Sequence, residues 1–297
     1  MSRRIIIGTR GSPLALTQSG MIRDQLAKEW PDFNFELLTI STTGDQLQLG
    51  PVKPVESTKA IFTKEIEEAL LRKDIDLAVH SAKDLAAHMP QGLCLGSVPK
   101  RESAMDALVV KPGLSLEKAG TGIILTGSAR RRRQWMDLHP QSKVEPVRGN
   151  IDRRIRKLME HQNATALILA MAGIRRLNPD LLGCTVEGIS PHVMIPAPGQ
   201  GTLALQCREG DNRTLHLLKP LHDEETGITL RAERSFLTAM NAGCSVPLGA
   251  FAWIAGENLH LAASYYPSES TSGRKEVLIG KPQDPEILGK TLSALFQ

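Results

Sequence analysis

Short apolar runs alternate with amphipathic segments along most of the chain. The first apolar run, at residues 4–8, is followed by Ser12-Pro13, a typical helix start with a capping hydroxyl and a proline at the first helical position. By the same pattern, helices are predicted at residues 13–30 and 61–73. Strands are predicted at residues 35–41, 75–80, 107–111, 122–125, 144–147, 166–170 and 202–207. Strands that alternate with helices predict parallel sheets with helices on both faces, which is an α/β fold.

The periodicity also assigns side chains to the interior. In the first helix the apolar residues fall on one face, which comprises Leu14, Met21, Ile22 and Leu26. In the second helix the same spacing directs five residues inward, namely Ile61, Phe62, Ile66, Ala69 and Leu70. These positions are the predicted contacts between the helices and the sheet.

The pattern changes from about residue 224. A helix at 224–240 is followed by strands at 250–255, 259–264 and 275–280 and by a last helix at 284–296, which predicts a small α+β domain. Cys244 lies between the helix and the first of these strands, next to Gly243 and Ser245. Its small neighbours leave a thiol accessible for covalent chemistry, although a single cysteine is more often a small buried apolar residue.

Composition and charge narrow the class of partner. With 297 residues, of which 41% are hydrophobic and 23% charged, the chain is an ordinary globular protein of two or three domains. The net charge is +4, yet residues 130–176 hold ten Arg and two Lys against four acids, a local charge of +8. This concentration indicates an anionic partner at one place. Trp135 is the single aromatic residue of the basic segment, which argues against single-stranded nucleic acid.

The spacing of the cysteines, the absence of a metal-binding histidine motif and the length of the apolar stretches exclude other classes of protein. Cys94, Cys184, Cys207 and Cys244 form no closely spaced pair, which supports neither a zinc site nor a disulfide framework. No HExxH motif occurs, so no metal site is predicted. The longest apolar stretch, residues 166–174, is nine residues long, far below the roughly 20 needed to span a bilayer. We therefore predict a cytoplasmic protein without a membrane segment.

Several predicted strands end in motifs suited to anions. The motifs share arginine, hydroxyl or glycine residues before a helix, and they are Gly8–Pro13, Thr126–Arg131, Arg148–Asn150 with the following Arg153, Arg154 and Arg156, and Ala172–Arg176. Each motif alone is as well explained by a solvated helix face. Together, at the C-terminal ends of strands, they predict a cleft for a substrate with many carboxylates or phosphates.

Three further segments carry candidate roles. His80–Asp84 follows another predicted strand and offers a carboxylate, Asp84, which could act in general acid or base catalysis, stabilise a developing cation, or cap the next helix. The turn Pro196–Gly201, which contains Gln200, precedes a strand and is predicted to be a hinge between domains. Residues 43–60 are irregular and are a candidate lid.

These motifs together resemble the porphobilinogen deaminase family, also called hydroxymethylbilane synthase, over essentially the full chain. The resemblance rests on the order of the motifs Thr9–Leu16, His80–Asp84, Arg148–Asn150, Pro196–Gly201 and Ala232–Arg234 followed by Gly243-Cys244. It implies two periplasmic-binding-protein-like α/β domains around a cleft and a small C-terminal α+β domain. We place these domains at residues 1–98 with 198–219, 99–197, and 220–297.

The resemblance also implies the activity. A dipyrromethane cofactor is attached through a thioether bond to the residue matching Cys244, four porphobilinogen molecules are added with loss of ammonia, and hydrolysis releases the linear tetrapyrrole. Asp84 matches the catalytic carboxylate, which holds pyrrole N–H groups and stabilises the cationic azafulvene. Further cofactor-binding positions are Lys83, Thr126, Ser128, Arg130, Arg131, Arg148 and Gly149. Substrate-binding positions are Arg10, Ser12, Gln18, Lys59, Phe62, Arg154 and Arg176. The family further implies a transferase of haem biosynthesis that is a monomer.

The chain departs from the family pattern in places. The segment Val55–Phe62 lacks the usual glycines of the lid, and Gly127 replaces a residue that commonly bears a hydroxyl. A non-catalytic relative that binds a polycarboxylate is therefore an alternative, although both Asp84 and Cys244 are retained. A nucleic-acid binder that uses residues 130–157 is a third reading, disfavoured by the scarcity of aromatic residues.

Overall fold

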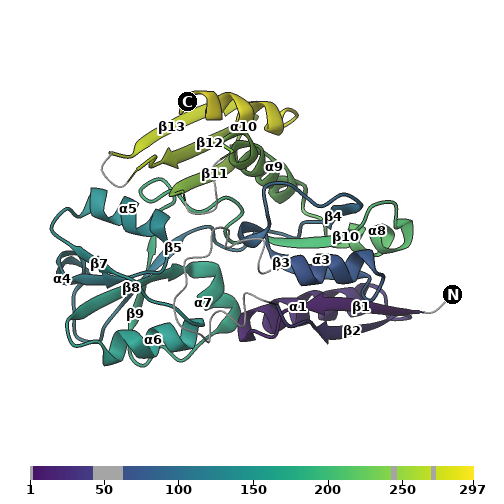
Figure 1. Cartoon of the computed structure of the whole chain (residues 1–297), viewed down its shortest axis with the longest axis horizontal. Helices are drawn as coiled ribbons and strands as arrows, with labels where there is room; N and C mark the ends of the chain where they lie inside the picture. Colours follow the sequence, from purple (N-terminus) through teal and green to yellow (C-terminus); the bar gives the residue numbers. More distant parts are fainter. Residues whose placement is uncertain (1–2, 43–62, 242–245, 269–271) are drawn as a thin grey trace. The chain divides into compact units, whose positions relative to one another are not determined.

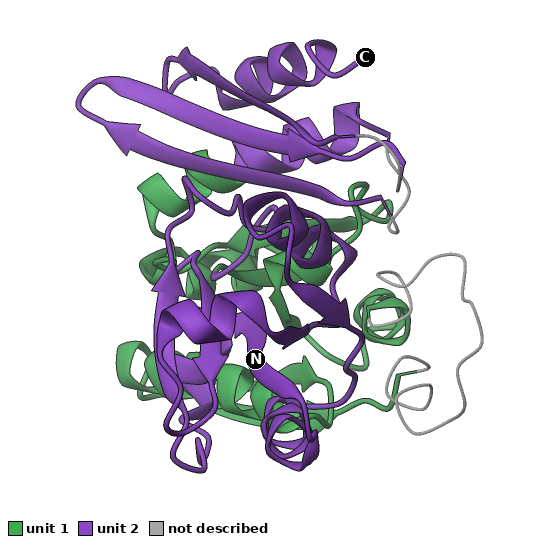
Figure 2. Ribbon diagram, turned by 90° about the vertical axis from the view of Figure 1, so that its left-hand side faces the viewer, with its two compact units in different colours: residues 1–102, 202–230 green, residues 103–201, 231–297 purple. Residues whose placement is uncertain are grey.

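A computed structural model describes residues 3–42, 63–241, 246–268 and 272–297. The chain forms two compact units, which are Met1–Glu102 with Thr202–Leu230 and Ser103–Gly201 with Arg231–Gln297 (Figure 2). The chain passes from one unit to the other after Glu102, after Gly201 and after Leu230. Among the described residues, no helix has the length and apolar character required to cross a membrane.

The first unit is built on a five-stranded sheet with the order β2-β1-β3-β10-β4 (Figure 1). Its strands are β1 (Arg4–Thr9), β2 (Asn34–Thr39), β3 (Leu77–Ser81), β4 (Leu93–Ser97) and β10 (Leu203–Arg208). Ile5 and Ile7 of β1 pack under α1 (Pro13–Glu29) and α8 (Asn212–Leu218), while Ile6 packs against the cluster under α3 (Lys64–Leu71). Both faces of the sheet are therefore covered, as predicted.

The second unit contains a sheet with the order β7-β6-β8-β5-β9. Its strands are β5 (Asp106–Val110), β6 (Ile123–Leu125), β7 (Lys143–Glu145), β8 (Ala164–Ala170) and β9 (Thr185–Ile189). One face packs on α6 (Ile151–Glu160) and α7 (Met171–Leu177), and the other on α4 (Leu116–Thr121) and α5 (Ala129–Leu138).

Both sheets are mixed, so the prediction of wholly parallel sheets was wrong. In the first sheet β10 runs antiparallel to β3 and β4, and in the second β5 runs antiparallel to β8 and β9. Each of these strands directly follows a point where the chain enters from the other unit. Such a strand is not joined to its neighbours by a local strand–helix–strand crossover, the connection that makes successive strands parallel.

The C-terminal part of the second unit is a three-stranded antiparallel sheet with two helices. Its strands are β11 (Leu248–Ala255), β12 (Asn258–Tyr265) and β13 (Arg274–Gly280), and its helices are α9 (Glu224–Ala239), which begins in the first unit, and α10 (Pro285–Ala294). Leu259 and Leu261 of β12 and Leu288 and Leu292 of α10 are buried. The predicted fold class, two α/β domains and a small α+β domain, is confirmed.

Some local predictions need correction. The strands β4 and β9 were not predicted, because Gly96 interrupts the first and the second lies at a sheet edge with only partly buried residues. In α1, Met21 is 40% exposed, and the buried face contains Gln18, Ser19, Ile22 and Leu26. Because Gln18 and Ser19 are polar, the spacing of apolar residues alone does not identify this face as the buried one.

Candidate active site and its anion-binding loops

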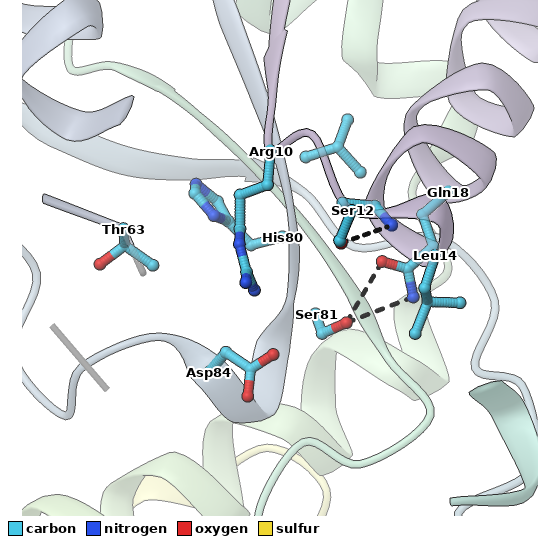
Figure 3. A pocket seen from close by; sticks show the side chains of 10 residues that line it. Arg10, Ser12, Leu14, Gln18, Thr63, His80, Ser81 and Asp84 are labelled. Carbon is cyan, nitrogen blue, oxygen red and sulfur yellow. Dashed lines mark hydrogen bonds between the residues drawn. The ribbon is translucent and has the colours of Figure 1, made fainter. Parts of the chain in front are cut away.

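Two strand ends of the first unit meet at one edge of its sheet. The strands β1 and β3 are parallel neighbours, so their C-terminal ends lie side by side. Arg10 follows β1, and Asp84 follows β3 after a short turn. Side chains from both segments line one pocket (Figure 3), whose residues are Arg10, Ser12, Leu14, Ala15, Gln18, Thr63, Val79, His80, Ser81 and Asp84. The predicted meeting of Arg10 and Asp84 at one site is observed.

The start of α1 supplies the polar wall of this pocket. Ser12 is the N-cap, and its Oγ accepts a hydrogen bond from the backbone N–H of Ala15 at 3.4 Å. One turn later, the buried Gln18 is hydrogen-bonded through its side-chain amide to Ser81 Oγ at 3.2 Å. These contacts join the helix start to the end of β3 and place a hydroxyl and an amide beside Arg10.

Asp84 is held by buried residues on either side of it. It ends a single 3-10 turn, Ala82–Asp84, in which Ala82 N–H donates to Thr202 O at 2.9 Å. Ala82 and Leu85 are buried in one apolar cluster. The half-buried carboxylate between them points into the pocket (Figure 3). Leu85 has an extended backbone, so Asp84 does not cap a following helix, and that alternative is rejected.

His80 also lines the pocket, and no role was predicted for it from the sequence. Its Nε2 is 3.0 Å from Oε1 of the buried Gln206, whose Nε2 donates to Glu67 Oε1 at 3.1 Å. Burial lowers the pKa of His80 to about 4, although the Gln206 hydrogen bond and Asp84 oppose this shift. The ring is therefore neutral at neutral pH. The sequence signal for these two residues is that His80 and Gln206 are polar residues within otherwise apolar strands.

In the second unit, three predicted anion-binding loops lie at one edge of the sheet. The strand β6 is parallel to its neighbours β7 and β8, so the loops that follow these strands share an edge. Ser128 caps α5 by accepting from Arg131 N–H at 3.4 Å. Gly149 has a φ of +116°, which side-chain-bearing residues rarely adopt, and its carbonyl accepts from Arg154 Nε at 2.7 Å.

Arg130 and Arg131 are nearly buried and share a partner that the sequence analysis missed. Asp106, wholly buried at the start of β5, accepts from Arg130 Nη1 at 2.8 Å and Nη2 at 3.1 Å, and from Arg131 Nε at 2.8 Å. Burial alone would raise the pKa of Asp106, but the two adjacent guanidinium groups hold it well below its usual range. The three side chains form a buried charged group, which we call the Asp106 network. An aspartate at a strand start gives no sequence signal for such a role.

The Asp106 network extends to the predicted hinge. Gln200 Nε2 donates to Asp106 Oδ1 at 2.9 Å and to Ala104 O at 2.8 Å, and Arg176 Nη2 donates to Gly201 O at 2.7 Å. On the other side of the turn, the buried Glu233 accepts from Gly199 N–H at 2.6 Å. The chain leaves this unit directly after Gly201, so the turn lies at a connection between the two units, and its role as a hinge stays a prediction.

The remaining predicted residues are placed less completely. Cys244, Lys59 and Phe62, together with the candidate lid at residues 43–60, lie outside the described residues. Lys83 lies next to Asp84 but does not line the pocket. Arg148 is exposed near the edge of the second sheet. Within the described part of the chain, no three His, Cys, Asp or Glu residues are grouped as a metal site would require.

Comparison with known proteins gives consistent matches along the chain. Residues 5–216 match the family profile described as "Porphobilinogen deaminase, dipyromethane cofactor binding domain", and residues 228–297 match "Porphobilinogen deaminase, C-terminal domain". The porphobilinogen deaminase of Listeria monocytogenes is 41% identical over 100% of this chain and 98% of its own length. That of Oceanobacillus iheyensis is 40% identical over 99% of this chain and 94% of its own length.

Solved structures give weaker matches. A VFT2 domain of Bordetella pertussis BvgS is 14% identical, with a TM-score of 0.44 over 78% of this chain and 91% of its own. A Salmonella typhimurium periplasmic binding protein with arginine specificity is 12% identical, with a TM-score of 0.41 over 76% of this chain and 94% of its own. The two profiles and the full-length relatives decide the assignment: the chain belongs to the porphobilinogen deaminase family.

Proposed function

We propose that this chain is an active hydroxymethylbilane synthase, a transferase of haem and tetrapyrrole biosynthesis. It condenses four porphobilinogen molecules head to tail on a dipyrromethane primer, with loss of one ammonia at each addition, and then releases the linear tetrapyrrole by hydrolysis. Besides membership of the family, the observation that carries the proposal is one pocket that contains both Arg10 and Asp84.

The donors of this pocket suit the substrate. Each porphobilinogen ring carries an acetate and a propionate, and Arg10, Ser12 and Gln18 present a guanidinium, a hydroxyl and an amide. Arginine binds a carboxylate through two parallel hydrogen bonds and stays charged throughout the physiological range. We assign these three side chains to a substrate carboxylate. Arg154 and Arg176 are assigned the same task in the second unit, and Lys59 and Phe62 complete the proposed substrate-binding set.

The residues also fit the cofactor, which is itself a polycarboxylate. When bound, dipyrromethane supplies the free pyrrole carbon to which the first substrate is joined. We assign its covalent attachment to Cys244. We assign its carboxylates to the polar and basic residues Lys83, Thr126, Ser128, Arg130, Arg131, Arg148 and Gly149. Asp106 directs the Arg130 and Arg131 guanidinium groups before any ligand binds, and such preorganised charge is effective because it needs no rearrangement during the reaction.

Asp84 is the catalytic carboxylate of the proposal. In each addition the bond between the aminomethyl carbon and its nitrogen breaks, and the nitrogen leaves as ammonia. A carbon–carbon bond to the growing chain then forms, and a proton is lost from the attacked pyrrole carbon. Positive charge develops on the substrate ring during this step. Asp84 accepts a hydrogen bond from the ring N–H and stabilises that positive charge. His80 is neutral and therefore does not form an ion pair with Asp84.

Intact-protein mass and turnover test the proposal together. Protein made with ample porphobilinogen should be heavier than 32.4 kDa by two linked pyrrole units, and Cys244→Ala should abolish the increase. Asp84→Asn should retain the added mass and lose nearly all turnover. Cys184→Ala, at a buried cysteine of the second unit, is the control and should keep the added mass. An unmodified mass in the wild-type protein would overturn the cofactor assignment. A polycarboxylate-binding relative would bind porphobilinogen without releasing ammonia.

We also propose a cytoplasmic monomer. The four cysteines do not have the sequence spacing of a disulfide framework, which supports a reducing compartment. Size-exclusion chromatography with light scattering measures the oligomeric state, and a mass of twice 32.4 kDa would contradict the monomer.

A further inference from the structure

Two cysteines of the first unit lie side by side although they are 113 residues apart in the sequence. Cys94 of β4 and Cys207 of β10 are directly opposite each other in the antiparallel register of these strands, and their Sγ atoms are 3.8 Å apart. Directly opposed residues of an antiparallel pair have Cα atoms about 4.5–5.5 Å apart, which lies within the range of about 4.4–6.8 Å found in disulfides. A disulfide can therefore form here by rotation of the two side chains, without a change in the pairing of the strands.

The packing around the Cys207 sulfur leaves it open toward Cys94. Cys207 is buried in the apolar cluster that contains Leu217 and Leu218. Gly96 lies two residues after Cys94 in β4, and a Cβ at this glycine would lie 2.8 Å from Cys207 Sγ. The Cys207 sulfur therefore extends toward β4, into space that exists because Gly96 has no side chain. Bulk between the two sulfur atoms is absent on this side of the strand pair.

The two thiols differ in their access to solvent. The strand β4 ends the strand order of its sheet, and Cys94 on this strand is partly exposed. Cys207 lies on β10, between β3 and β4, and is 0% exposed. Burial raises the pKa of Cys207 to about 12, and the neighbouring Cys94 adds to this shift. Since the thiolate is the reactive form of a cysteine, access and protonation both leave Cys94 as the thiol that reacts first with an oxidant in solution.

We propose that Cys94 and Cys207 are a peroxide-sensitive thiol pair, which forms a reversible disulfide that fixes β4 to β10. In the first step the Cys94 sulfur attacks one oxygen of hydrogen peroxide. An S–O bond forms, the O–O bond breaks, and the leaving hydroxide takes the Cys94 proton to become water, which leaves a sulfenic acid on Cys94. In the second step the Cys207 sulfur attacks the Cys94 sulfur. The S–S bond forms, the S–O bond breaks, and the hydroxyl leaves as water with the Cys207 proton. The two thiols lose two electrons, which the peroxide gains, and a dithiol reductant reverses the change.

The disulfide would secure an irregular edge of the sheet. The strand β4 has five residues, contains Gly96 and shows a shift in its register with β10. The chain leaves the first unit soon after β4 and returns directly before β10, so a bond between Cys94 and Cys207 closes a loop that contains all of Ser103–Gly201. Cross-links that close long loops restrict the unfolded chain most, so the disulfide stabilises the folded protein. In a reducing compartment the two thiols stay reduced, and the bond forms when peroxide rises.

Peptide mapping tests the disulfide directly. Holoprotein freed of reductant is treated with hydrogen peroxide at a dose that oxidises half of the free glutathione in a parallel solution. The remaining thiols are alkylated, and the protein is digested with trypsin and Glu-C, because cleavage after Glu187 separates Cys184 from Cys207. We expect residues 84–100 and 188–208 to be joined, lighter by two hydrogen atoms than the two thiol peptides together, and to be separated by dithiothreitol. Failure of this pair to form, or a bond from either peptide to another cysteine, would overturn the proposal.

Single substitutions separate the roles of the two thiols. In Cys207→Ser the sulfenic acid of Cys94 has no thiol opposite it, so dimedone, which reacts with sulfenic acids, should label Cys94 several-fold more than in the wild-type protein. In Cys94→Ser the buried Cys207 should stay an unmodified thiol at the same dose of peroxide. Cys184→Ser, at a buried cysteine of the second unit, is the matched control and should form the disulfide as the wild-type protein does. Equal dimedone labelling of Cys94 in Cys207→Ser and in the wild-type protein would contradict these roles.

Thermal unfolding tests whether the bond fixes β4 to β10. The midpoint of the oxidised wild-type protein should lie about 5–10 °C above that of the reduced protein, the shift expected for a disulfide that closes a long loop, and dithiothreitol should abolish the difference. Cys94→Ser treated with the same peroxide is the control for oxidation at other residues and should show no rise. A disulfide that leaves the midpoint unchanged, or an equal rise in Cys94→Ser, would refute the stabilising role. Neither measurement uses turnover, so the result does not depend on the proposed function.

Discussion

His80 gives the stability of the protein a defined dependence on pH. Its pKa in the folded protein is about 4, below the usual 6.5, mainly because of burial. As the pH falls below 6.5 the unfolded chain takes up a proton at this residue, whereas the folded protein does not until about pH 4. Acid therefore favours unfolding. The contribution of His80 is fully present above pH 6.5 and is lost as the pH falls from 6.5 to 4.

The size of the effect follows from the shift in pKa. A shift of one unit corresponds to about 1.4 kcal/mol, so the whole contribution is about 3 kcal/mol. Between pH 7.5 and pH 5, about 2 kcal/mol of it should be lost. In His80→Asn no group titrates at this position, so the variant should lose about 2 kcal/mol less than the wild-type protein over the same interval.

Urea unfolding at pH 7.5 and pH 5, followed by far-UV circular dichroism, measures this difference. The free energy of unfolding is taken from the midpoint and slope of each transition. The substitution also changes packing, but that change is present at both pH values and cancels in the comparison. Equal losses in the two proteins, or a His80 pKa near 6.5 from an NMR titration, would refute the reasoning.

Two further predictions concern the second unit. Asp106→Asn leaves two buried guanidinium groups without their carboxylate and should lower the free energy of unfolding by about 3–5 kcal/mol, whereas the exposed Asp24→Asn should change it by less than about 0.5 kcal/mol in the same urea titration. Gly127→Ala should lower the thermal midpoint, because a Cβ at residue 127 would lie 2.6 Å from Val147 O and would cost about 1–3 kcal/mol. Gly20→Ala, where a Cβ meets no atom within 4 Å, is the control, and an equal loss there would contradict the steric explanation.

Local patterns in the sequence predicted most of the elements correctly. Ser12-Pro13 marked the start of α1, and apolar spacing identified the buried Ile66 and Leu70 of α3. Arginines after predicted strands indicated an anion site, and Arg10 and Asp84 do share a pocket. These features are readable because capping, periodic burial and the common edge of parallel strands depend on short stretches of chain.

Other features depend on residues that are distant in sequence. The antiparallel strands β5 and β10 arise where the chain returns from the other unit, a long connection that leaves no local signal. Met21 was expected on the buried face of α1, but the face that packs against the sheet contains Gln18 instead. Which face is buried depends on the position of the neighbouring strands.

The sequence by itself determined the fold class and the family, and it predicted the basic residues of the proposed ligand site. The tertiary structure decided which partners the charged residues have. Asp106 meets Arg130 across 24 residues, and Gln206 joins Glu67 and His80 across 139 and 126 residues. Polar groups that leave water need partners, and folding brings those partners from any part of the chain. A sequence pattern therefore shows which side chains carry charge, and only the folded protein shows what each charge is used for.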